Sequence, residues 1–222
     1  MTLVRRLAVA ALVVSGLGLL LSLVVRIGSV ADADRAATRW LHDRAIESDA
    51  VSRFALDVTA IGNPLTLTAF VVITAGWLLF HRRGRAAVWL VAVTLVASVV
   101  ESLLKVVVGR ARPDFDSVFL EPVTRSFPSG HAMNTTVVLG AIAVAVVTSA
   151  TSRRSGVVPL AAAVAAIVAF AVGTSRPILG VHFVSDVVAG WALGVIWLLV
   201  TRPRADDDVD REVSAEQVPA SA

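Results

Sequence analysis

Three short polar clusters hold the residues of this chain that could do chemistry. The first is Lys105-Val-Val-Val-Gly-Arg-Ala-Arg112-Pro113, which begins with the only lysine of the sequence. The second is Pro128-Ser129-Gly130-His131, and the third runs from Ser175-Arg176 to His182 and Asp186. Cations, imidazoles and a carboxylate can together bind a phosphoryl group, attack it and move a proton. The clusters therefore predict one phosphate-handling site.

His182 and Asp186 are four residues apart and share a face if they begin a helix. The carboxylate can then hold one imidazole nitrogen, fix the tautomer and leave the other nitrogen free to attack. The chain has no cysteine, and Ser129 and Ser175 have no histidine–carboxylate pair of their own, so His182 itself can be the nucleophile. His131 is then the proton handler, for which an unperturbed pKa of about 6.5 is suitable.

The remaining polar residues suit the oxygens of a phosphate. Arg112 and Arg176 offer planar forks, and Lys105 offers a compact point charge. Ser129 and Gly130 stand just before an expected helix, whose free N–H groups and positive dipole end favour an anion. With these cations and a general acid, the chemistry requires neither a metal nor a cofactor in principle.

Composition indicates what positions these clusters. The 222 residues are 56% hydrophobic and the mean hydropathy is +0.79, which is far more apolar than a soluble domain. About 20 mainly apolar residues span a bilayer as a helix. We therefore expect an all-α bundle of six transmembrane helices, at residues 7–25, 64–80, 86–104, 132–150, 156–174 and 184–200.

Arginines in alternate loops predict the orientation of these spans. The basic loops contain Arg5-Arg6, Arg82-Arg83 with Arg85, Arg153-Arg154, and Arg202 with Arg204. The positive-inside rule makes these loops cytoplasmic, together with both termini. The loops at 26–63, 105–131 and 175–183 then lie outside, so all three polar clusters are expected on the extracytoplasmic face of the cell membrane.

Three segments need separate interpretation. The N-terminus imitates a secretory signal, but its apolar run is longer than usual for one and Arg26 intervenes, so a retained first helix is favoured. Residues 32–63 have apolar positions at helical spacing and predict an amphipathic outer segment at the interface, or a lid over the site. The polar tail at 203–222 predicts a disordered cytoplasmic end to a single domain of residues 1–202.

The clusters match, position for position, the three-part signature of the type-2 phosphatidic acid phosphatase superfamily, and the chain resembles that family over about residues 55–200. The resemblance implies His182 as nucleophile, Asp186 as its partner and His131 as general acid. It implies as phosphate binders Lys105, Arg112, Ser129, Gly130 and Arg176. The six-helix order is similar to that of the membrane-bound lipid phosphatases of the family.

The sequence thus predicts a membrane phosphatase that removes a terminal phosphate from a lipid phosphate or diphosphate through a phosphohistidine, without metal. Polyprenyl diphosphate is the favoured substrate, and phosphatidic acid and phosphatidylglycerophosphate are the alternatives. A catalytically idle membrane protein that binds lipid phosphate is the alternative from another class. Scattered arginines make nucleic acid a poor partner, and nothing in the sequence predicts the oligomeric state.

Several residues have two interpretations. Glu101 either pairs with Lys105 one helical turn later or is solvated at the interface. Arg110 and Arg125 could contact a headgroup, but solvated loop charge is favoured. His42 and His81 lie outside the clusters and have no predicted role. The tryptophans near span ends, Trp77, Trp89, Trp191 and Trp197, are expected to be interfacial anchors.

Overall fold

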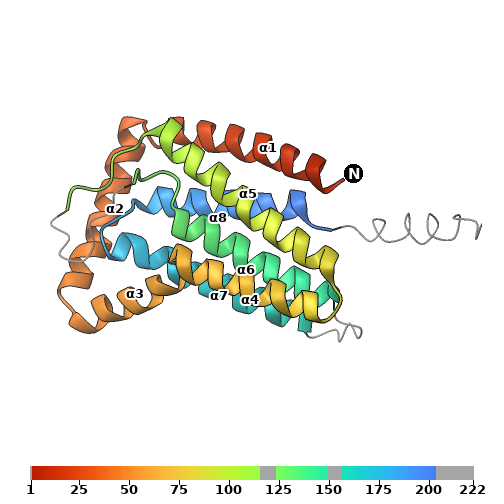
Figure 1. Ribbon diagram of the computed structural model, residues 1–222. Coiled ribbons are helices and arrows are strands. Elements are labelled where there is room, and N and C mark those ends of the chain that lie inside the picture. Colours follow the sequence, from red (N-terminus) through yellow and green to blue (C-terminus); the bar gives the residue numbers. More distant parts are fainter. Residues whose placement is uncertain (1, 116–123, 150–156, 204–222) are drawn as a thin grey trace, which may run out of the picture.

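The computed structural model describes residues 2–115, 124–149 and 157–203. Across these ranges the chain forms eight helices (Figure 1): α1 Leu3–Val24, α2 Gly28–Ile46, α3 Asp49–Ile61, α4 Pro64–Phe80, α5 Gly84–Val108, α6 Gly130–Ser149, α7 Val157–Ile178 and α8 Val184–Thr201. The all-α prediction is confirmed. The predicted tail from residue 204 and the loop with Arg153 and Arg154 lie outside the described residues.

The helices include the predicted membrane spans, with one difference. α1, α5, α6, α7 and α8 are each long and apolar enough to cross a membrane. α4 has 17 residues and meets the same criterion only together with α3, from which it is bent by 44°. α4 is the single helix expected at 64–80, and the difference from the prediction is that it can count as a span only together with the bent α3. Many large apolar side chains, such as Leu12, Val72 and Val106, face outward, as a bilayer requires.

α6 lies at the centre of the bundle and packs against α4, α5, α7 and α8. Gly190 lets α8 approach α6 closely, because a Cβ there would lie 2.7 Å from the carbonyl oxygen of Ser129. The core between these helices contains fully buried Leu90, Val93 and Met133. This crossing brings the beginnings of α6 and α8 together.

Two tryptophans belong to this core and are not interfacial anchors as expected. Trp89 and Trp197 are 7% and 0% exposed. The indole of Trp89 donates to the carbonyl oxygen of Thr201 at 2.9 Å, and that of Trp197 donates to the carbonyl oxygen of Val93 at 3.1 Å. Since a buried indole N–H needs a partner, these bonds join α5 to α8.

The predicted outer segment at residues 32–63 consists of most of α2 and all of α3. α2 crosses one end of the bundle, and α3 leads from it towards α4 (Figure 1). α2 contacts α7, α8 and α3, and α3 packs against α7. The predicted amphipathic outer segment is therefore a pair of helices docked on the bundle, at the end opposite the N-terminus of α1.

Candidate active site

The three polar clusters meet at the end of the bundle that α2 covers. Lys105 is in the last turn of α5, Gly130 begins α6, Arg176 is in the last turn of α7 and Asp186 is the third residue of α8. Lys105 was expected at the end of the third span, and α5 continues past it to Val108; Arg176 was expected in a loop, but α7 continues through Pro177 to Ile178. Both side chains are therefore held by helices, which position them more rigidly than loops.

Asp186 is buried and held from several directions. Its Oδ1 accepts a hydrogen bond from Arg110 Nη1 at 2.5 Å. Its Oδ2 accepts from the hydroxyl of Ser126 and from the backbone N–H of Phe183, the latter at 3.0 Å. Because these donors restrict the carboxylate, its oxygen stays on the Nδ1 side of His182, at 3.4 Å. That distance is long for a hydrogen bond, as is common for catalytic pairs without substrate.

His182 is 1% exposed and presents its other nitrogen to Arg112. Arg112 Nη1 lies 2.9 Å from His182 Nε2, and a guanidinium can only donate. Nε2 therefore accepts, and the proton of the neutral ring is on Nδ1, towards Asp186. Burial lowers the pKa of His182 to about 3, so the ring is neutral near pH 7. A neutral imidazole with its lone pair on Nε2 is the nucleophilic form.

Arg112 itself is held by the loop before α6. Its Nε donates to the carbonyl oxygen of Thr124 at 2.7 Å, and its Nη2 donates to the hydroxyl of Thr124 at 3.0 Å. Its Nη1 also donates to the carbonyl oxygen of Val181 at 2.5 Å. The guanidinium is thus already oriented over Nε2 of His182.

Lys105 and Glu101 form the predicted pair on α5. Lys105 Nζ lies 3.1 Å from Glu101 Oε1, with both side chains largely buried. Lys105 Nζ also donates to the carbonyl oxygen of Arg125 at 3.2 Å. The same Glu101 oxygen lies against Gly130, where an added Cβ would be only 2.6 Å away. Glu101 is therefore not solvated, and its carboxylate fills the space that Gly130 leaves at the start of α6.

Arg176 and His131 lie beside the α3–α4 pair. Arg176 Nη1 donates to the hydroxyl of Thr59 on α3 at 2.6 Å, while its Nε has no hydrogen-bond partner among the described residues. A Cβ on Gly62 would lie 2.9 Å from Cδ2 of His131. Gly62 follows Thr59, the partner of Arg176, so His131 and Arg176 both lie at the end of α3. His131 also comes two residues after Ser129, whose backbone N–H donates to the carbonyl oxygen of Asp186.

The hydrogen bonds of Ser129 are made to backbone groups at the starts of two helices. Its backbone N–H donates to the carbonyl oxygen of Asp186 at 3.0 Å, and its hydroxyl lies 3.5 Å from the backbone nitrogen of Ala132. The residue is fully buried. Ser129 therefore joins the start of α6 to the start of α8, whatever else it contacts when substrate is present.

Three residues with direct contacts at this site were not predicted. Arg110, expected to be solvated, has a side chain only 11% exposed and pairs with both Asp186 and Asp34. Asp34 on α2 and Ser126 in the loop before α6 had no distinguishing sequence pattern. Arg110 lies inside the first cluster, two residues before Arg112. That position was the one sequence feature that could have indicated a role for Arg110 in the site. Arg125 is exposed, as expected.

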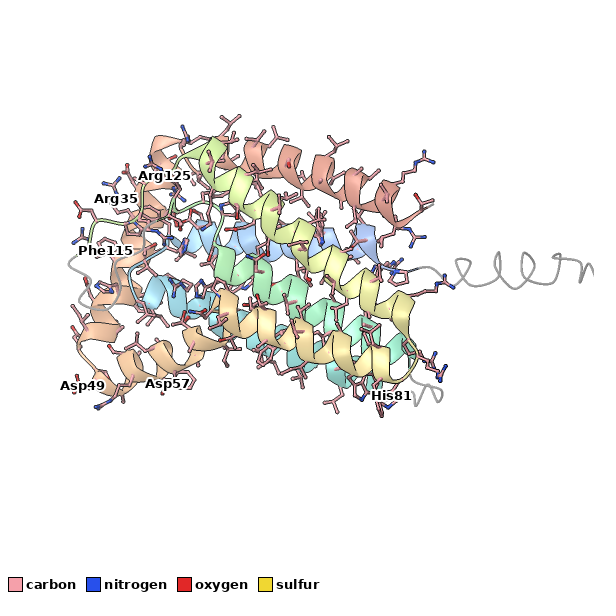
Figure 2. All side chains as sticks on the ribbon, in the orientation of Figure 1. Arg35, Asp49, Asp57, His81, Phe115 and Arg125 are labelled. Carbon is pink, nitrogen blue, oxygen red and sulfur yellow. The ribbon has the colours of Figure 1, made fainter. Side chains whose placement is uncertain are left out.

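The two remaining histidines have no predicted role at this site. His81 is at the opposite end of the bundle from Arg35, Phe115 and Arg125 (Figure 2). His42 is buried on α2, where its Nδ1 donates to the carbonyl oxygen of Ile178 at 3.1 Å and its ring stacks on Phe115. Its contacts join α2 to the end of α7.

Comparison with known proteins shows which family the chain resembles. Residues 86–208 match the model of the PAP2 superfamily. Phosphatidylglycerophosphatase B of Bacillus subtilis is 29% identical over 186 residues, which cover 83% of this chain and 89% of that protein. Decaprenylphosphoryl-5-phosphoribose phosphatase of Mycobacterium tuberculosis is 35% identical over 161 residues, 68% of this chain and 81% of that protein. A crystal structure of a transmembrane PAP2 type phosphatidylglycerolphosphate phosphatase from Bacillus subtilis superposes with a TM-score of 0.77 at 25% identity, over 96% of this chain and 98% of that one.

Proposed function

Because the chain belongs to the PAP2 superfamily, and is therefore a multi-pass membrane lipid phosphate phosphatase, we propose that it transfers the terminal phosphoryl group of its substrate to His182. The observation that carries this proposal is the orientation of the His182 ring. Its Nε2 faces Arg112 at 2.9 Å, and its Nδ1 faces the held carboxylate of Asp186.

In the first half of the reaction, the lone pair of His182 Nε2 attacks phosphorus and the bond from phosphorus to the lipid oxygen breaks. His131 donates a proton to that leaving oxygen, so the lipid departs neutral at this atom. The phosphorylated imidazole is positively charged, and Asp186 stabilises it through Nδ1–H. Arg112 turns its donors from Nε2 to the phosphoryl oxygens, where Lys105 and Arg176 supply further positive charge.

In the second half, His131 accepts a proton from water, and the water oxygen attacks phosphorus. The bond from phosphorus to Nε2 then breaks, which regenerates neutral His182 and releases inorganic phosphate. The two steps need one acid–base group on the side of the leaving oxygen, and His131 suits that role because it is in the first turn of α6, at the end of the bundle that holds Arg176 and His182. Gly130 and the backbone N–H groups at the start of α6 add donors for the phosphoryl oxygens.

We propose that no resident metal takes part. The chemical support is the donor set: the carboxylates nearest the reacting groups, Asp186 and Glu101, are already paired with Arg110 and Lys105. Within the described ranges no group of three or more His, Asp or Glu side chains is arranged to hold a metal ion. The cations that a phosphoryl transfer needs are instead side chains.

We further propose that this site faces the extracytoplasmic side. Arg5, Arg82, Arg83, Arg85 and Arg202 all belong to the opposite end of the bundle, where no described residue is Asp or Glu. The site end also has arginines, but Arg110, Arg112 and Arg176 belong to the proposed site itself, so we take the arginines of the opposite end as the marker of the cytoplasmic side. A reporter attached beside Arg83 and another beside Arg125 should report opposite sides. A cytoplasmic signal from the Arg125 position would overturn this orientation.

Polyprenyl diphosphate remains the substrate we favour, with phosphatidylglycerophosphate as the second candidate. The Mycobacterium relative is named for a decaprenyl-linked phosphate, which is a polyprenyl lipid. The two Bacillus comparisons are named for phosphatidylglycerophosphate and favour the second candidate. Comparing kcat/KM for these two lipids and phosphatidic acid, with purified protein, decides the ranking.

The deciding experiment measures phosphate release by purified full-length protein from the same lipids in excess chelator. We expect turnover, and a loss of about 10³-fold or more in His182→Ala. His81→Ala is the matched control, because that histidine is at the other end of the bundle (Figure 2). Labelled substrate should leave an acid-labile, base-stable phosphoenzyme. Full activity of His182→Ala, or a need for added metal, would refute the mechanism.

A further inference from the structure

The start of α8 receives its hydrogen-bond acceptors from α2. The residue before the helix, Phe183, has no side-chain acceptor that could cap it. The backbone N–H of Val184 donates to the hydroxyl oxygen of Thr38 at 3.2 Å, and that of Ser185 donates to Asp34 Oδ1 at 3.0 Å. The first N–H groups of a helix have no partner within it. Two side chains of α2 therefore determine where α8 begins, and so where Asp186 stands.

Asp34 also connects to Asp186 through a single guanidinium. Arg110 Nη2 donates to Asp34 Oδ2 at 2.8 Å, and Arg110 Nη1 donates to Asp186 Oδ1 at 2.5 Å. The same Nη1 donates to the hydroxyl of Ser185 at 2.8 Å, and that hydroxyl also contacts Asp34. The guanidinium lies over the ring of Phe183, 4.2 Å from its centroid. One buried cation thus bridges a carboxylate of α2 and the carboxylate beside His182.

We propose that Asp34 and Arg110 are positioning residues for catalysis, and that α2, docked through Asp34, holds Asp186 in register with His182. The inference rests on the proposed function. Shared between two carboxylates, Arg110 pulls on Asp186 Oδ1 and leaves Oδ2 directed towards His182 Nδ1. Without the charge of Asp34, the buried guanidinium has one anion left and draws Asp186 towards itself, away from an imidazole that is already 3.4 Å distant.

A purely structural role for Asp34 makes a different prediction. Loss of packing would lower thermal stability and disturb binding and turnover together. Loss of positioning lowers kcat and spares KM, because the side chains proposed to bind phosphate are not bonded to Asp34. Those side chains are Lys105, Arg112 and Arg176, whose partners lie elsewhere.

The test compares Asp34→Asn with Asp32→Asn in the full-length protein. Asparagine keeps an acceptor for the N–H of Ser185, removes the charge, and replaces the oxygen that accepts from Arg110 by a donor. Asp32 is exposed on the same helix and is the matched control. We expect kcat to fall at least about tenfold in Asp34→Asn, with KM within about twofold of wild type, and no change in Asp32→Asn. Equal kcat in the two variants would overturn the inference.

A double variant tests whether Asp34 acts through Arg110. Arg110→Gln should lower kcat, and adding Asp34→Asn to it should lower kcat less than twofold further, because effects through a shared partner are not additive. Effects that multiply would contradict the bridge. If Asp34→Asn does not fold, Thr38→Val replaces it. Loss of that acceptor should lower kcat at least threefold, Thr38→Ser should restore it, and an unchanged kcat in Thr38→Val would count against the proposal.

One readout needs no turnover and separates this inference from the proposed function. The ¹⁵N resonance of His182 Nδ1 reports its bond to Asp186. Asp34→Asn should shift it, and Asp32→Asn should leave it in place. If wild-type protein hydrolyses no lipid phosphate, the proposed function fails while the resonance still tests the positioning. An unshifted resonance in Asp34→Asn, in active protein, refutes the positioning alone.

Discussion

Replacing Gly130 by alanine tests why a glycine begins α6. An added Cβ would lie 2.6 Å from Oε1 and 3.2 Å from Cδ of Glu101. Ordinary contact begins at about 3.4 Å, so the carboxylate must retreat by about 0.8 Å. It cannot move alone, because Lys105 Nζ lies 3.1 Å from the same oxygen. The methyl group therefore displaces the lysine that we propose binds a phosphoryl oxygen.

The size of the effect follows from that displacement. Moving a group at a reacting centre by about 1 Å costs about 10²-fold in rate, so kcat/KM of Gly130→Ala should fall by between about 10-fold and 10²-fold. Overpacking of this kind costs about 1–3 kcal/mol of folding free energy. Phosphate release from a lipid phosphate gives the rate, and thermal unfolding in detergent shows that the variant is folded.

Making Gly130→Ala in two variants of Glu101 separates the effect of the shape of that side chain from the effect of its charge. Glu101→Gln has the same outline, so the penalty of Gly130→Ala should persist there. Glu101→Ala removes the obstructing group, and the penalty should shrink to less than about threefold. A penalty that stays the same in the Glu101→Ala background would refute the reasoning. Gly130 would then be needed for close approach of the backbone to the phosphate itself.

Three further predictions follow from single contacts at the site. Arg112→Lys should raise KM about tenfold or more in steady-state assays, because one ammonium cannot keep the bonds to Thr124 and also bind two oxygens; an unchanged KM would contradict the proposed role. Thr59→Val should raise KM several-fold by freeing Arg176, and Thr59→Ser should restore it, since the serine hydroxyl also accepts at this position; equal KM values in both variants would argue against a role for this bond. Burial lowers the pKa of His182 to about 3 in the folded protein, whereas the pKa in the unfolded chain is about 6.5. The neutral His182 side chain therefore contributes fully to stability above pH 6.5, and this contribution is lost as the pH falls towards 3. Between pH 7 and 4.5 the unfolding free energy of wild type should therefore decrease by up to about 2–3 kcal/mol more than that of His182→Gln, and parallel melting curves would exclude this linkage.

Much of the fold could be predicted because membrane helices follow from local properties. A long apolar run must satisfy its backbone polar groups within one helix, so all six apolar helices, including α4 at Pro64–Phe80, could be predicted from the sequence. The bend between α3 and α4 could not, because it depends on how α3 packs against α7. The tryptophan prediction failed for a related reason, since burial of Trp89 and Trp197 depends on the neighbouring helix.

The sequence by itself determined the residue types of the candidate site, their order and their spacing. Glu101 and Lys105 meet because they are four residues apart in α5. His182 lies before α8, which begins at Val184, so the turn before that helix and not helical spacing places it beside Asp186. Alternating spans bring the three clusters to one end of the bundle.

Only the tertiary structure decided which partners hold these groups in place. Asp34 and Arg110 are 76 residues apart, and Asp34 and Ser185 are 151 apart. No periodicity reports such a pairing, because it depends on how α2 crosses the end of the bundle. A buried charge is stable only with a partner, so the packing that buries Arg110 also requires two carboxylates beside it. A sequence pattern can show that Arg110 is present, but only the packing shows that it is buried.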